Sequence, residues 1–141
     1  MKVNLSVFGR FHAFDLAKQL EKHKVLNKLV TTYPRFKALD WVVNNEKVTS
    51  YPVFEVVNRL NGKTTRADLI NWALKALFAR RSSRWMDCDI FVGFSGASLE
   101  AIIEAKRRGV PFVLERGSCH YSIQQEFLVK EFLKWLHSII T

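Results

Sequence analysis

Residues 89–117 read DIFVGFSGASLEAIIEAKRRGVPFVLERG. Residues 89–94 and 111–114 form two nearly unbroken apolar runs. Between them, the apolar residues of 99–108 recur at helical spacing, and Gly109 follows at the position where a helix commonly ends. This order predicts a strand, a helix and a second strand. Strands this apolar are typical of a parallel sheet covered on both faces, because two parallel strands need a crossover helix. The stretch therefore predicts an α/β fold.

The rest of the chain continues the same alternation. Apolar patterns predict further strands at 3–8, 25–32 and 48–51, and helices at 12–23, 53–60, 65–84 and 122–139. Thr65 is a candidate N-cap, because its hydroxyl can accept a hydrogen bond from a free helix N–H. A length of 141 residues suits one domain. We expect a single Rossmann-like domain over 1–141, with a mostly parallel sheet and helices on both faces.

Composition narrows the class of protein. Hydrophobic residues make up 48% of the chain and aromatic residues 13%, which is typical of a globular protein. The start of the chain lacks a signal-peptide pattern, and the apolar runs fall far short of the ~20 residues of a membrane span. We therefore expect a soluble, cytoplasmic protein. Cys88 and Cys119 lack CxxC or Cys/His spacing, which favours two reduced thiols and no metal or cofactor.

The formal net charge of +9 fits three interpretations: nucleic-acid binding, contact with an anionic membrane, or a solvated surface with capped helix ends. No nucleic-acid motif is present, so nucleic acid is not an expected partner. Arginines at the end of the 65–84 helix also suit the helix dipole. A peripheral membrane contact is the second expectation, because basic and aromatic residues alternate in this region. These residues are Trp72, Lys75, Phe78, Arg80, Arg81, Arg84 and Trp85.

In an open parallel sheet, ligands bind beyond the carboxyl ends of the strands. The loop after the first strand holds Gly9, Arg10 and His12, which supply a tight turn, a cation and an imidazole. The loop after 89–94 holds Ser95 and Gly96 and opens a helix whose free N–H groups can bind an anion. Neither loop matches GxGxxG or GxSxG. Both are candidate substrate-binding loops, and both could equally serve only to turn the chain and cap a helix.

A third loop, 115–120, follows the last strand and reads ERGSCH. It places an acid, a base, a glycine and an imidazole within six positions, which favours a functional loop. Its candidate catalytic residues are Glu115 and His120, and its candidate substrate-binding residues are Arg116, Gly117 and Ser118. The alternative is that Glu115 pairs with Arg116 and that His120 caps the next helix.

Residues 89–101 and 109–118 resemble the family-4 glycosyltransferases of the GT-B fold, and residues 7–12 with Leu16 and Ala17 are similar to the first strand, glycine loop and helix of that family's N-terminal domain. The resemblance spans nearly the whole chain. It implies retaining transfer of a sugar from a nucleotide-sugar donor to a saccharide or lipid-linked acceptor. The N-terminal domain would shape the acceptor side, Gly9 would approach the donor phosphates, and the 115–120 loop would face the reacting sugar.

Two departures from the family qualify that expectation. The family's C-terminal donor-binding domain has no counterpart in these residues, so the resemblance predicts half of an enzyme, inactive alone, that works with a separate donor-binding chain or as a homo-oligomer. Many members also place a histidine where this chain has Glu115 and Arg116. Two rival hypotheses remain open: a scaffold module that recruits a partner through its last helix, and a self-contained phosphate-binding enzyme with a pocket around Arg10, Ser95 and Arg116.

Overall fold

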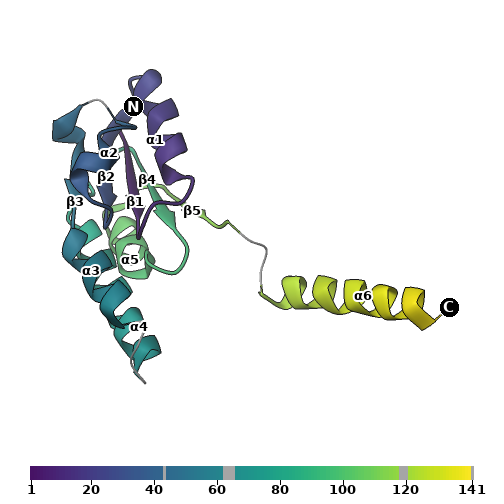
Figure 1. The fold of residues 1–141 in the computed structure, drawn as a ribbon. Coiled ribbons are helices and arrows are strands. Elements are labelled where there is room, and N and C mark those ends of the chain that lie inside the picture. Colours follow the sequence, from purple (N-terminus) through teal and green to yellow (C-terminus); the bar gives the residue numbers. More distant parts are fainter. Residues whose placement is uncertain (43, 62–65, 118–120, 141) are drawn as a thin grey trace.

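The computed structural model describes residues 1–42, 44–61, 66–117 and 121–140. Five strands form one sheet in the order β3-β2-β1-β4-β5, and every neighbouring pair is parallel (Figure 1). The predicted α/β, Rossmann-like class is therefore confirmed. The strands are β1 (Val3–Val7), β2 (Leu26–Thr31), β3 (Val48–Ser50), β4 (Ile90–Phe94) and β5 (Phe112–Glu115). The helices are α1 (Ala13–Lys22), α2 (Arg35–Ala38), the 3-10 helix η1 (Asn45–Lys47), α3 (Pro52–Asn61), α4 (Ala67–Ser82), α5 (Leu99–Arg108) and α6 (Tyr121–Ile140).

Helices pack on both faces of the sheet. On one face, Phe14 of α1 is buried in the same apolar cluster as Leu5 of β1. On the other face, Val30 of β2 packs with Phe78 of α4, and Phe91 of β4 packs with Ala101 of α5. Burial of these side chains supplies the main stabilisation, at about 1.5–3 kcal/mol for each large apolar side chain. The sheet therefore lies between two helical layers.

The central strand β1 is buried along its whole length, including its two polar residues. The Asn4 amide donates to the carbonyl oxygen of Trp85 at 2.7 Å, and the hydroxyls of Ser6 and Ser82 are 2.7 Å apart. A buried polar group needs such a partner, because an unpaired one loses its hydrogen bonds to water. These contacts join the middle of the sheet to the end of α4.

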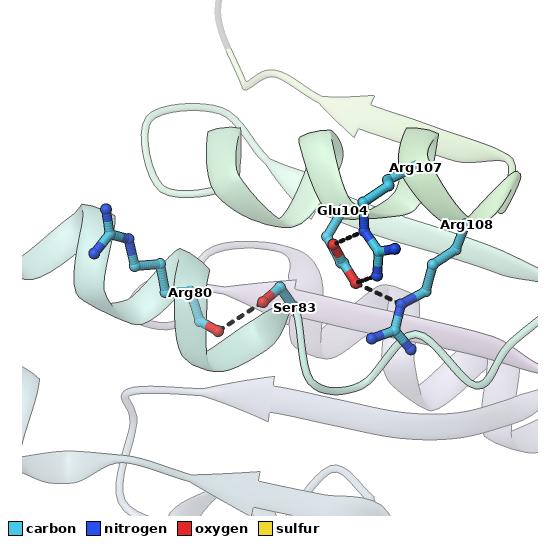
Figure 2. A network of polar contacts seen from close by, with 5 residues as sticks. All are labelled: Arg80, Ser83, Glu104, Arg107 and Arg108. Atoms are coloured by element: carbon cyan, nitrogen blue, oxygen red, sulfur yellow. Dashed lines mark hydrogen bonds and ion pairs between the residues drawn. The ribbon is translucent and has the colours of Figure 1, made fainter.

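The helix ends differ in small ways from the sequence predictions. Arg66 is the N-cap residue of α4 and makes no side-chain capping bond, while the predicted cap Thr65 lies outside the described residues. Gly109 ends α5 in the left-handed conformation, with φ +70°, as its position predicts. In the last turn of α5, Arg107 and Arg108 both donate to the Glu104 carboxylate (Figure 2). These bonds, led by those from Arg107, lower the Glu104 pKa to about 2.

The edge strand β5 is less covered than its apolar sequence predicts. Phe112, Val113 and Leu114 keep 36%, 48% and 49% of their surfaces exposed. The expectation of cover on both faces is wrong for this strand, because α6, the next element, projects away from the sheet (Figure 1). Cys88 is a free, half-buried thiol whose pKa is raised by burial, and Cys119 lies outside the described residues.

Candidate functional site

A crevice lies at the carboxyl edge of the sheet, where the chain changes direction. β1 and β4 are neighbours, but the chain leaves β1 toward β2 and leaves β4 toward β5. The loops that follow the two strands therefore diverge, and such a switch point is where open α/β sheets bind ligands. A cavity of about 380 Å³ opens there between both loops and the helices α3 and α4. Its lining is Phe8, Gly9, Phe11, Glu55, Asn58, Asn71, Lys75, Ser95, Gly96 and Ala97.

The loop after β1 is fixed by two buried threonines. The Gly9 N–H donates to Oγ1 of Thr32 at 2.8 Å, and the Gly9 carbonyl accepts from Oγ1 of Thr31 at 2.8 Å. Gly9 has φ +93°, a conformation that favours glycine. Phe11 also has a positive φ, +40°, which is uncommon for an aromatic residue, and 69% of its surface is exposed. The loop thus holds an aromatic ring at the rim of the cavity.

The loop after β4 is tied to the end of β5. The Ser95 N–H donates to the Glu115 carbonyl at 2.9 Å, and Gly96 has φ +91°. Ser95 and Gly96, two of the predicted substrate-binding residues, are exposed and line the cavity. Ser98 does not, because its buried hydroxyl donates back to the Phe94 carbonyl at 2.7 Å.

His12 and Glu115 form a pair beside the crevice. Nε2 of His12 lies 3.1 Å from Oε1 of Glu115, and the side chains remain 48% and 38% exposed. The imidazole also contacts the Phe94 ring edge to face, with centroids 5.2 Å apart. Gly117 lies against the same imidazole, since a β-carbon there would be 3.7 Å from Cε1 of His12. The partner of Glu115 is thus His12, which lies in another loop, rather than Arg116.

Other predicted site residues lie elsewhere. The Arg10 guanidinium stacks on Trp41 at 5.0 Å and lines a separate cavity of about 450 Å³, so Arg10 does not join Gly9 in the crevice. Arg116 is exposed in the loop after β5. The predicted catalytic His120 and the predicted substrate-binding Ser118 fall outside the described residues.

Four polar residues of the crevice are absent from the predicted site: Glu55 and Asn58 of α3, and Asn71 and Lys75 of α4. The two residues of each pair lie three or four positions apart, which places them on one side of their helix. That spacing was a usable signal. Local periodicity does not reveal which strand ends a distant helix will cover, so the sequence alone directed attention to the loops.

The basic and aromatic residues expected to face a membrane together do not share one surface. Phe78 is fully buried in the core, and the half-buried Trp85 packs against the same cluster. Trp72 is 68% exposed. The predicted grouping therefore fails, because one of its rings fills the space between α4 and the sheet.

The chain matches no known family model, no curated protein and no solved structure. Within the described residues, no cluster of three or more His, Cys, Asp or Glu side chains could hold a metal ion. In the same part of the chain, no helix combines the length and hydropathy that a membrane crossing requires.

Proposed function

We propose that this chain forms the acceptor side of a glycosyltransferase that moves a sugar from a nucleotide-sugar donor to a saccharide or lipid-linked acceptor. The observation that carries the proposal is the polar crevice at the switch point of the sheet, which combines amides, a carboxylate, an ammonium group and an exposed aromatic ring. Fold alone would not support this choice, since Rossmann-like sheets serve many reactions.

The lining of the crevice suits a polyhydroxylated ligand. Each sugar hydroxyl both donates and accepts hydrogen bonds, and the amides of Asn58 and Asn71 do the same. Glu55 adds an acceptor and Lys75 a donor. The exposed ring of Phe11 offers an apolar surface at the rim, where the C–H face of a sugar ring can pack. A few placed polar groups beside apolar surface are typical of small-molecule sites.

The His12 and Glu115 pair supplies the acid–base chemistry in this proposal. The acceptor hydroxyl oxygen forms a bond to the anomeric carbon of the donor, and the bond from that carbon to the diphosphate breaks, so the nucleoside diphosphate leaves with the electron pair. His12 takes the hydroxyl proton, and Glu115 orients the imidazole and stabilises the imidazolium, as a carboxylate does in a catalytic triad. A donor-binding domain or chain would form the opposite wall, because transfer requires both reactants held together away from water.

Calorimetric titration of the chain with simple glycosides and with nucleotide sugars tests the proposal. We expect binding of a glycoside and none of a nucleotide sugar, because the donor site belongs to the opposite wall. Asn58→Ala and Asn71→Ala should each weaken glycoside binding about tenfold, the effect of about 1.4 kcal/mol from lost hydrogen bonds. Asn45→Ala is the matched control, because Asn45 is an exposed amide outside the crevice lining.

Two results would contradict the proposal. Tight binding of a nucleotide sugar by the isolated chain would indicate a self-sufficient nucleotide site. Glycoside binding that is equally insensitive to Asn58→Ala, Asn71→Ala and Asn45→Ala would place the ligand outside the crevice.

A second candidate function is a binding module that recruits a partner through α6. The observation in its favour is that α6 projects from the domain with apolar side chains exposed, including Phe127, Leu128 and Leu133 at 62%, 63% and 58% (Figure 1). Several large apolar side chains exposed on one helix are typical of an interaction site. If this function holds through self-association, the double variant Phe127→Ser/Leu133→Ser should abolish the association that light scattering detects. The same variant should leave glycoside binding unchanged.

A further inference from the structure

Helix α3 faces the domain with Phe54 and several polar residues, and it faces solvent with aliphatic side chains. Asn61 is buried and donates to the Ala67 carbonyl at 2.9 Å, and Glu55 and Asn58 line the crevice. The opposite side carries four aliphatic residues at positions i, i+3, i+4 and i+7, the spacing of one helix face. These are Val53, Val56, Val57 and Leu60, exposed by 61%, 54%, 37% and 72%. An ordinary surface helix has the reverse arrangement.

Helix α4 also carries exposed apolar residues. α3 and α4 pack against each other, and Leu69, Trp72 and Leu77 of α4 are exposed by 65%, 68% and 51%. We call these seven residues the hairpin surface: Val53, Val56, Val57, Leu60, Leu69, Trp72 and Leu77. Single exposed apolar residues are normal on a folded protein, but a group of this size on one pair of helices indicates a docking surface.

Cations surround the hairpin surface. Residues 52–84 contain seven Lys and Arg residues and two acidic residues, and one of the acids, Glu55, is already paired with Arg59 at 2.9 Å. Arg66 and Arg80 are exposed at the two ends of α4. The Arg80 guanidinium points away from the Glu104 cluster, which binds Arg107 and Arg108 instead (Figure 2). The apolar residues therefore lie within a strongly positive region.

We propose that the hairpin surface docks on an anionic lipid membrane. Its valine and leucine side chains would enter the boundary between headgroups and acyl chains, Trp72 would lie at the interface, and the arginines would contact lipid phosphates. A second copy of the chain is a poorer occupant, because a symmetric contact would bring two like-charged regions together.

Docking in this way would place the crevice next to the lipid headgroups. Asn58 and Glu55 lie on the crevice side of the helix whose other side carries Val56 and Leu60. A lipid-linked ligand would then reach the crevice from the membrane. The docking surface itself rests on α3 and α4 alone, and it does not depend on the reaction proposed above.

Co-sedimentation with lipid vesicles tests the proposal. The full chain should bind vesicles of phosphatidylcholine that contain phosphatidylglycerol, should bind pure phosphatidylcholine more weakly, and should lose affinity as salt is raised. The double variant Val56→Ser/Leu60→Ser should weaken binding at least tenfold. The matched control is Leu128→Ser, which removes an apolar side chain that is 63% exposed on α6, away from α3 and α4 (Figure 1), and it should bind as the wild type does.

Three outcomes would overturn the proposal: no binding to either vesicle, equal loss in the hairpin variant and in Leu128→Ser, or a dimer in light scattering that Val56→Ser/Leu60→Ser dissociates. Circular dichroism should show that all variants are folded, because every substituted residue is exposed. The assay contains no sugar and no nucleotide. Its failure would therefore leave the glycosyltransferase proposal standing, and failure of the titrations would leave membrane docking standing.

Discussion

Gly93 lies in the middle of β4, where Ser98 packs directly over its Cα. A β-carbon added at this position would lie 2.6 Å from Oγ and 2.8 Å from Cβ of Ser98, and 3.3 Å from Cε1 of Phe91. Ser98 is buried, and its hydroxyl is held by the Phe94 carbonyl at 2.7 Å. The serine can therefore move aside only by disturbing this hydrogen bond. We predict that Gly93→Ala destabilises the fold.

The magnitude follows from two costs. Overpacking of a tight interior costs about 1–3 kcal/mol, and loss of the Ser98 hydrogen bond adds about 1 kcal/mol. The free energy of unfolding should therefore fall by about 2–4 kcal/mol, a large fraction of the stability of a small domain. Equilibrium unfolding in urea, followed by circular dichroism, measures this difference.

Two further variants isolate the cause. The double variant Gly93→Ala/Ser98→Gly removes both colliding atoms, and it should be as stable as Ser98→Gly alone to within about 1 kcal/mol. Gly117→Ala is the matched control, because the nearest atom to its added carbon is 3.7 Å away, and its effect should stay within about 0.5 kcal/mol. The reasoning is refuted if Gly93→Ala unfolds at the same urea concentration as the wild type, or if Ser98→Gly gives no recovery.

Three other predictions concern the polar and backbone features of the fold. The Glu104 pKa is lowered to about 2 from 4.5, so the ionised carboxylate stabilises the fold above pH 4.5, and this contribution is lost as the pH falls toward 2. In Glu104→Gln the free energy of unfolding should therefore change less with pH between 4.5 and 2. Parallel pH dependences in the variant and the wild type would contradict this. Ser6→Ala leaves the buried Ser82 hydroxyl unpaired and should cost about 1–3 kcal/mol in urea unfolding, with Ser6→Ala/Ser82→Ala costing less than the two single variants added together. Gly109→Ala forces a side chain into a left-handed φ of +70° and should cost about 1 kcal/mol, visible as a lower Tm.

The sequence was sufficient to predict the strands and helices that depend on local pattern. The apolar runs around residues 90 and 113, the helix between them and the stop at Gly109 all appear in the structure. Between residues 33 and 47 the sequence pattern predicts no helix or strand. The structure adds α2 and η1 there, one turn each, which are too short for periodicity to mark.

The features that the sequence did not reveal depend on tertiary packing. Phe78 and Trp72 belong to the same helix, yet one is buried and the other exposed, because only the crossing of α4 over β2 decides which side is inward. Glu115 has a near neighbour of opposite charge, Arg116, and yet contacts His12, since the ends of β1 and β5, on either side of β4, bring distant residues together. The Arg10 side chain likewise lies outside the crevice, because its guanidinium stacks on the Trp41 ring.

The most direct test of the central claim is amide chemical-shift mapping of the labelled full chain during titration with a panel of simple glycosides. The account predicts that the largest shifts fall around the crevice, at Phe11, Asn58, Asn71 and Gly96, and that nucleotide sugars produce none. Shifts centred instead on Arg10 and Trp41, or an equal response to a nucleotide sugar, would contradict an acceptor site in the crevice.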